Sequence, residues 1–61
     1  MRLERLPEVL ARTSLSRAHL YSLITSGAFP RPKRVGKRAV AWVSEDIDEW
    51  IETRPLGGSW R

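Results

Sequence analysis

Apolar residues at helical spacing mark one short helix as the central element of the chain. Leu20, Leu23 and Ile24 recur at intervals of three and four residues, which places them on one face of a helix. Ser16 is a good N-cap, because its hydroxyl can accept a hydrogen bond from a free backbone N–H of the first turn. Gly27 readily adopts the left-handed conformation that closes a helix. The pattern therefore predicts a helix between Ser16 and Gly27.

The opposite face of this helix has a different character. It carries Ala18, Ser22 and Thr25, with Arg17 and Tyr21 on its flank. These side chains are short or polar and none is acidic, which suits a helix that enters a DNA groove. We expect Arg17, Ala18 and Ser22 to reach base edges in the major groove, where the four base pairs differ.

A second helix is predicted just before the first. Leu6, Val9 and Leu10 repeat at helical spacing, and Pro7 suits a first helical turn because its missing N–H has no partner there. We expect a helix over residues 7–12. About three residues then join the two helices, which is the spacing of a helix-turn-helix.

A β-hairpin is predicted after Gly27. Pro30 and Pro32 exclude helix, and residues 33–35 and 39–43 have the composition of strands. Gly36-Lys37 between them fits a two-residue type II′ turn. This register is expected to place three side chains on the face toward the core: Val35, Val40 and Trp42.

A third helix completes the predicted domain. Ser44 is its expected N-cap, and Pro55 ends it. The expected core is Leu6, Val9, Leu10, Leu20, Leu23, Ile24, Phe29, Val40, Trp42, Ile47, Trp50 and Ile51. Truncating Trp50 to alanine is expected to cost roughly 3–5 kcal/mol. We expect one domain over residues 1–54 and a flexible tail over residues 55–61, in which Trp60 either docks on the domain or is loose.

Charge is distributed unevenly along the 61 residues. The formal net charge is +4, with 11 Lys and Arg against 7 Asp and Glu. Residues 1–43 hold nine basic and two acidic side chains, whereas residues 44–61 hold two basic and five acidic ones. This asymmetry favours one surface that faces a polyanion and another that faces away from it.

The hairpin carries the densest basic cluster. Five of the eleven basic residues fall within eight positions: Arg31, Lys33, Arg34, Lys37 and Arg38. The cluster indicates a wing that lies against DNA phosphates. Charges also protect strand edges from aggregation, but one or two charges suffice for that purpose.

Several classes of protein are disfavoured by composition. The chain has no cysteine, which excludes disulfides and thiolate metal sites, and its one histidine, His19, cannot build a metal site alone, so no cofactor or metal is expected. No apolar run spans a bilayer and no signal peptide is evident, so a soluble cytoplasmic protein is expected. Ser16 and His19 lie three residues apart, but no carboxylate completes a catalytic group, and we expect no enzyme. His19 is expected on the helix surface, within reach of a phosphate.

The order of helix, turn, helix, basic hairpin and helix resembles the winged-helix relatives of the MerR regulators. The closer resemblance is to the AlpA-like family of phage and prophage regulators, which is related to the small excisionases. The residues that carry it are Leu6-Pro7-Glu8-Val9-Leu10, Leu15-Ser16-Arg17, Tyr21-Ser22-Leu23-Ile24, Gly27-Ala28-Phe29-Pro30, Val40-Ala41-Trp42, Asp46-Ile47 and Trp50-Ile51. They extend over nearly the whole chain.

The resemblance implies a mainly α fold with a small β-hairpin, a winged helix-turn-helix of the MerR type. It implies a bacterial or phage protein that binds specific double-stranded DNA at the nucleoid and controls integrase or excision genes, or an excisionase-type factor that bends attachment-site DNA. The second helix would lie in the major groove, and the hairpin would be the wing. The expected contacts are Ser16, Arg17, Ala18, His19, Tyr21 and Ser22 from the helix, and Arg31, Lys33, Arg34, Lys37 and Arg38 from the wing.

A protein-interaction module is the alternative of another class. It would use the acidic face of residues 45–52, or Trp60, to inhibit a regulator. Salt-dependent binding to duplex DNA separates the two hypotheses. No effector domain or coiled coil is expected, so we predict no small-molecule effector and a monomer in solution, with neighbouring copies binding cooperatively on DNA.

Overall fold

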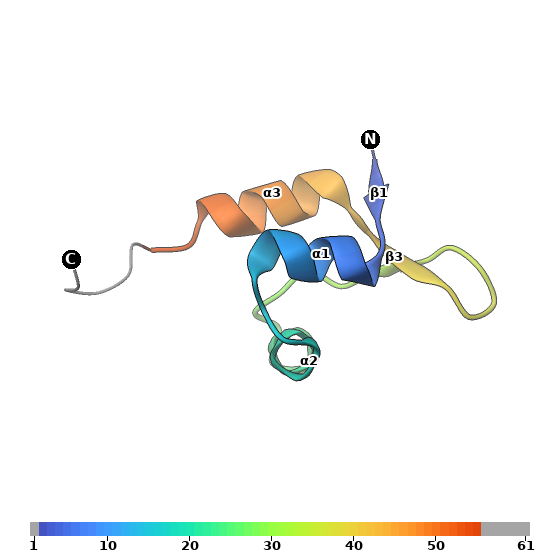
Figure 1. Cartoon of the computed structure of the whole chain (residues 1–61), viewed down its shortest axis with the longest axis horizontal. Coiled ribbons are helices and arrows are strands. Elements are labelled where there is room, and N and C mark those ends of the chain that lie inside the picture. Colours follow the sequence, from blue (N-terminus) through green and yellow to red (C-terminus); the bar gives the residue numbers. More distant parts are fainter. Residues whose placement is uncertain (1, 56–61) are drawn as a thin grey trace.

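Three helices and a small antiparallel sheet form the part of the chain that the computed structural model describes, residues 2–55 (Figure 1). The elements in order are β1 (Leu3–Glu4), α1 (Leu6–Thr13), α2 (Arg17–Thr25), β2 (Lys33–Arg34), β3 (Val40–Val43) and α3 (Ser44–Glu52). This architecture confirms the predicted fold class, a mainly helical domain with a hairpin. None of the helices within residues 2–55 is long and apolar enough to cross a bilayer.

Strand β1 is an element that the sequence did not predict. The sheet order is β1-β3-β2, and Leu3 pairs with Val43 while Glu4 pairs with Trp42. The Ser44 N–H extends the pairing by donating to the Arg2 carbonyl at 2.7 Å. Two residues are too few to show alternation, so this strand exists only because the free edge of β3 lies beside it.

The predicted hairpin turn is wrong in its register. Lys33 pairs with Ala41, and the Val35 N–H donates to the Ala39 carbonyl at 2.9 Å. The loop therefore has three residues, 36–38, and Gly36 does not have the positive φ that a type II′ turn requires.

The predicted core face of the hairpin is wrong at two of its three positions. Trp42 is fully buried, but Val35 is 45% exposed and Val40 is 36% exposed. Both valines belong to this hairpin, whose loop end projects beyond the helices (Figure 1).

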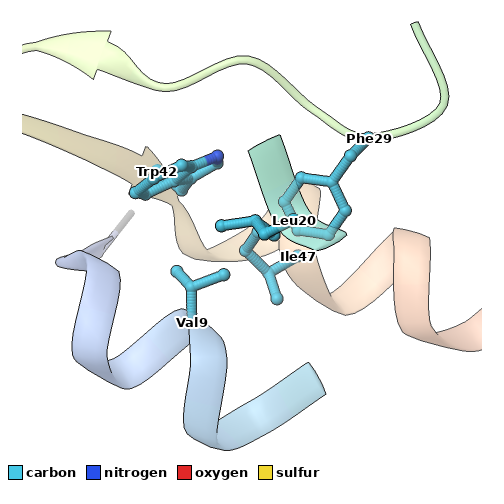
Figure 2. Close-up of a cluster of buried hydrophobic side chains, with 5 residues drawn as sticks. All are labelled: Val9, Leu20, Phe29, Trp42 and Ile47. Carbon is cyan, nitrogen blue, oxygen red and sulfur yellow. The ribbon is translucent and has the colours of Figure 1, made fainter. Parts of the chain in front are cut away.

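The core lies where all three helices meet the sheet. Its buried side chains are Val9 from α1, Leu20 from α2, Phe29 from the following loop, Trp42 from β3 and Ile47 from α3 (Figure 2). Seven partly buried side chains pack around them: Leu6, Leu10, Leu15, Leu23, Ile24, Trp50 and Ile51. The predicted core is confirmed apart from Val40. Trp50 lies at its margin, where its Nε1–H donates to the Ala28 carbonyl at 2.8 Å.

Both predicted ends of the central helix are confirmed. The Ser16 hydroxyl accepts a hydrogen bond from the His19 N–H at 3.1 Å. Gly27 has φ +82°, and the N–H of Ala28 donates back to the Leu23 carbonyl at 2.8 Å. This pattern is a Schellman motif, which satisfies carbonyls that the end of the helix would otherwise leave free.

Gly27→Ala is expected to destabilise the domain by about 1 kcal/mol, because a side chain disfavours the left-handed conformation. The added Cβ would meet no heavy atom within 4 Å, so the cost is confined to the backbone. Gly36→Ala is the matched control, since its Cβ would lie at an ordinary 3.5 Å from that of Ala39 and its φ is not positive. Urea unfolding of both variants measures the difference, and equal midpoints would contradict the assigned helix end.

Helix α3 begins differently from the prediction. Val43 is its N-cap, and Ser44 is already the first helical residue. The Ser44 hydroxyl instead donates to the Glu4 carboxylate at 2.9 Å. The assignment of Ser44 as N-cap is therefore wrong, because a buried carboxylate on β1 takes the hydroxyl that would otherwise cap the helix.

Glu4 joins β1 to two helices although it is a charged residue with no exposed surface. Besides Ser44, its carboxylate contacts the guanidinium groups of Arg12, at 3.1 Å, and Arg2, at 3.3 Å. Arg12 also pairs with Asp48 of α3 at 2.7 Å. Burial alone would raise the pKa of the Glu4 carboxyl, but these hydrogen bonds outweigh burial and lower the pKa below its ordinary value.

Candidate nucleic-acid interface

Helix α2 presents its predicted contact residues to the outside. Leu20 is fully buried and fixes the helix on the core. The six predicted contacts on and before the helix are all exposed: Ser16, Arg17, Ala18, His19, Tyr21 and Ser22. The structure thus leaves a small, polar and non-acidic face open, as the spacing of the apolar residues predicts.

The turn before α2 holds it firmly against α1. Three residues join the helices, and Ser14 among them adopts the left-handed conformation with φ 61°. The Thr13 hydroxyl donates to the Val9 carbonyl at 2.8 Å and accepts a hydrogen bond from the Leu15 N–H at 3.4 Å. The pair α1–α2 is therefore a compact helix-turn-helix with the predicted connection length.

The basic residues divide into two groups by what they contact. Arg2 and Arg12 form ion pairs with carboxylates, and the Arg54 guanidinium lies 4.2 Å above the ring of Trp50. The five hairpin residues are exposed and have no ion pair with any residue in the range 2–55: Arg31, Lys33, Arg34, Lys37 and Arg38. The first group stabilises the fold, and the second is available to an external anion.

A concavity lies between the helix-turn-helix and the hairpin. It has a volume of about 430 Å³, and its lining comes from the start of α1, from α2 and from the hairpin. The lining residues are Arg5, Leu6, Pro7, Arg17, Tyr21, Arg38 and Val40. Arg17, Tyr21 and Arg38 were predicted contacts.

Arg5 also lines the concavity, although the sequence did not predict it as a contact residue. Nothing around it marks a binding residue, and only the packing of α1 beside α2 and the hairpin places it here. No acidic residue lines this concavity.

Two acidic residues of α3 line a different hollow. It has a volume of about 270 Å³ and is lined by Pro30, Asp46, Glu49, Trp50 and Thr53, most of them from α3. In the view of Figure 1, α3 is at the top and α2 is seen end-on at the bottom. On the folded domain, three arginines therefore line one hollow, and two carboxylates, those of Asp46 and Glu49, line the other.

The described residues do not form a catalytic group or a metal site. The Ser16 hydroxyl contacts the backbone N–H of His19 and makes no contact with its imidazole. No three His, Asp or Glu side chains within residues 2–55 are placed to hold a metal ion. What these side chains can do chemically is bind an anionic ligand along α2 and the hairpin. Trp60 and the rest of the expected tail, residues 56–61, lie outside the described residues.

The sequence is similar to a known family and to proteins of a bacterium and a phage. Residues 2–55 match the family described as prophage CP4-57 regulatory protein (AlpA). The chain is 32% identical over 60 residues to the DNA-binding transcriptional activator AlpA of Escherichia coli K12, covering 88% of this chain and 86% of that protein. It is also 38% identical over 53 residues to the uncharacterized protein ORF88 of Enterobacteria phage P4, covering 87% of this chain and 60% of that protein.

Proposed function

We propose, from the premise that this chain belongs to the AlpA family of prophage regulatory proteins, that it is a transcription regulator that binds double-stranded DNA. The observation that carries the proposal is the exposed, non-acidic face of α2 beside a hairpin whose five exposed cations have no ion pair with any residue in the range 2–55. The E. coli relative is named as a DNA-binding transcriptional activator, which supports this assignment. The family is one of regulators, not of enzymes.

Helix α2 is the element proposed to read the DNA sequence. Helix α2 combines an apolar side fixed on the core with an outer side that includes short residues, among them Ala18 and Ser22. Short side chains let a helix approach the floor of the major groove, where hydroxyl groups can contact base edges. Its first turn contains no acidic residue that would repel the phosphates on either side.

The hairpin is proposed to act as a wing on the phosphate backbone. Lys33 and Arg34 form β2, an edge strand, and Lys37 lies in the projecting loop (Figure 1). Long cations at such positions reach phosphates easily, and phosphate contacts carry no sequence information directly. Affinity and sequence preference are therefore expected to come from different elements.

Two alanine variants can distinguish the proposed role of the wing from that of the reading helix. Lys37→Ala is expected to weaken binding to a cognate and a scrambled duplex by a similar factor. It should also lower the slope of log affinity against log salt concentration by about one unit, as for one lost phosphate contact. Ser22→Ala is expected to weaken binding to the cognate duplex only, without a change in salt dependence. Titration of both variants at several salt concentrations measures these effects.

Two results would count against the proposal in different ways. If Lys37→Ala changes sequence preference while Ser22→Ala does not, the roles of wing and helix have been exchanged. If the unmodified protein binds no duplex, the protein-interaction hypothesis, based on the acidic residues of α3, takes its place.

We also propose that the free protein is a monomer and that neighbouring copies bind together on DNA. The large apolar side chains exposed within residues 2–55 are Leu3, Tyr21, Val35 and Val40, and they form no continuous helical stripe. Sedimentation should show a monomer at micromolar concentration, and a tight dimer under those conditions would contradict this.

A further inference from the structure

We infer that the concavity between α1, α2 and the hairpin is a binding site for one phosphate of the DNA backbone. Arg5, Arg17 and Arg38 hold this phosphate together. The inference rests on the proposed function and adds a site and a residue to it. Arg5 lies outside both the recognition helix and the wing.

The electrostatics of the concavity favour an anion. Its three guanidinium groups come from three separate segments of the chain, and none has an ion pair with a described residue. With no acidic side chain among the residues that line it, the three positive charges can act together on an anion in the hollow. Guanidinium groups also match the geometry of phosphate oxygens, to which each can donate two parallel hydrogen bonds.

The start of α1 adds to this attraction. Arg5, Leu6 and Pro7 are the cap and first residues of the helix, where the backbone dipoles leave a partial positive charge. The Glu8 carboxylate accepts the Arg5 backbone N–H at 3.0 Å and is not among the residues that line the concavity. The Arg5 guanidinium therefore remains available.

The apolar part of the lining indicates a sugar–phosphate backbone as the ligand. Leu6, Pro7 and Val40 line the concavity beside the arginines, together with Tyr21. Deoxyribose presents C–H groups next to each phosphate, and such apolar walls can cover them. This role also accounts for the exposure of Val40, at 36%, and Tyr21, at 41%. The Tyr21 hydroxyl can donate to a phosphate oxygen.

One consequence concerns Arg17, which the sequence alone led us to expect at a base edge. In this site it contacts a phosphate instead, and base reading passes to Ala18, His19 and Ser22 on the same helix. A single phosphate held by α1, α2 and the hairpin at once would fix the depth and angle at which α2 enters the groove. Arg5 and Arg38 are thus positioning residues for the reading helix.

The test counts phosphates through the salt dependence of binding to a short random-sequence duplex. Each neutralised phosphate contributes about 0.9 to the slope of log affinity against log salt. Because the three arginines share one phosphate, the triple variant Arg5→Ala, Arg17→Ala, Arg38→Ala is expected to lower the slope by about one unit. The matched control loses the same charge from separate wing positions, as Arg31→Ala, Lys33→Ala, Lys37→Ala, and is expected to lower the slope by about three units.

Single variants assign the individual contacts. Arg5→Ala and Arg17→Ala should each weaken binding to random and cognate duplexes by the same factor. The control Arg54→Ala removes a charge at the far end of α3 and should leave the affinity for both duplexes unchanged. Circular dichroism melts confirm that each variant is folded. A slope reduction of about three units in the first triple variant would overturn the shared site.

Further outcomes distinguish a failure of this inference from a failure of the proposed function. An Arg5→Ala protein with unchanged affinity, or an Arg17→Ala protein weakened on cognate DNA alone, would likewise overturn the inference while leaving the proposed function intact. If the unmodified protein shows no salt-dependent binding to the duplex, the proposed function itself fails.

Discussion

Replacing Trp42 with alanine is expected to unfold most of the protein at physiological temperature. Trp42 has no exposed surface, belongs to the buried core cluster, and donates its Nε1–H to the Pro30 carbonyl at 2.9 Å (Figure 2). Truncating a buried tryptophan costs roughly 3–5 kcal/mol. A single core in a domain of this size rarely supplies more than about 3–5 kcal/mol in total. The loss therefore approaches the whole stability of the fold.

The measurement is thermal and urea unfolding of Trp42→Ala beside two controls. Val40→Ala lies on the same strand and the same side, but its side chain is exposed, so its effect should stay within about 0.5 kcal/mol. Trp50→Ala should cost less than the roughly 3–5 kcal/mol that the sequence alone predicts for it, because Trp50 is only partly buried. It should still have an intermediate effect, since its ring stacks edge-on against Phe29 at 4.8 Å between ring centres. If Trp42→Ala melts close to the unmodified protein, Trp42 does not hold the core.

Glu4→Gln is expected to cost about 2 kcal/mol at neutral pH, because hydrogen bonds to a charged group contribute about 1.5–3 kcal/mol and those to a neutral amide less. The glutamine keeps the size of the side chain, so the change removes the charge and leaves the shape. The carboxylate of Glu4 is what links β1 to Arg12 of α1 and to Ser44 of α3. Its loss should therefore loosen the pairing of β1 with β3 as well as lower global stability.

The pH dependence of this effect follows from the lowered pKa of Glu4 in the folded protein. Between the folded and unfolded pKa values the unfolded chain binds more protons, so stability rises with pH there. The stabilisation is complete above the unfolded value, about 4.3 for glutamate, and is lost as the pH falls through the folded value. The difference between Glu4→Gln and the unmodified protein should therefore be constant near neutrality and shrink in acid.

Urea unfolding at several pH values measures this difference. Glu52→Gln is the matched control, since Glu52 is an exposed residue in the last turn of α3 and should change stability little at any pH. A Glu4→Gln effect that stays the same from neutral pH into acid would show that the charge of Glu4 does not stabilise the fold.

The helices could be predicted from the sequence because their signals are local. The Ser16 cap, the left-handed Gly27 and the apolar face of Leu20 depend on residues within one or two turns of one another. Interactions at such short separation form in the same way wherever the helix later packs. The short connection between α1 and α2 follows from the same local signals, and so does the exposure of the contact face on α2.

Features that join distant segments could not be predicted in this way. Strand β1 needs the edge of β3, and the Ser44 hydroxyl turns from its helix end to a carboxylate 40 positions away. The exposure of Val40 depends on how the hairpin packs beside the helices. The register of the hairpin depends on a turn whose backbone conformation glycine permits but does not dictate.

The candidate interface shows the same division. The basic residues of the hairpin and the open face of α2 follow from residue type and spacing along the chain. The concavity of Arg5, Arg17 and Arg38 does not, because these residues lie 12 to 33 positions apart and meet only after three elements have packed on the core. Long-range burial of apolar side chains brings the three arginines to one hollow, an arrangement that no local pattern in the sequence reveals.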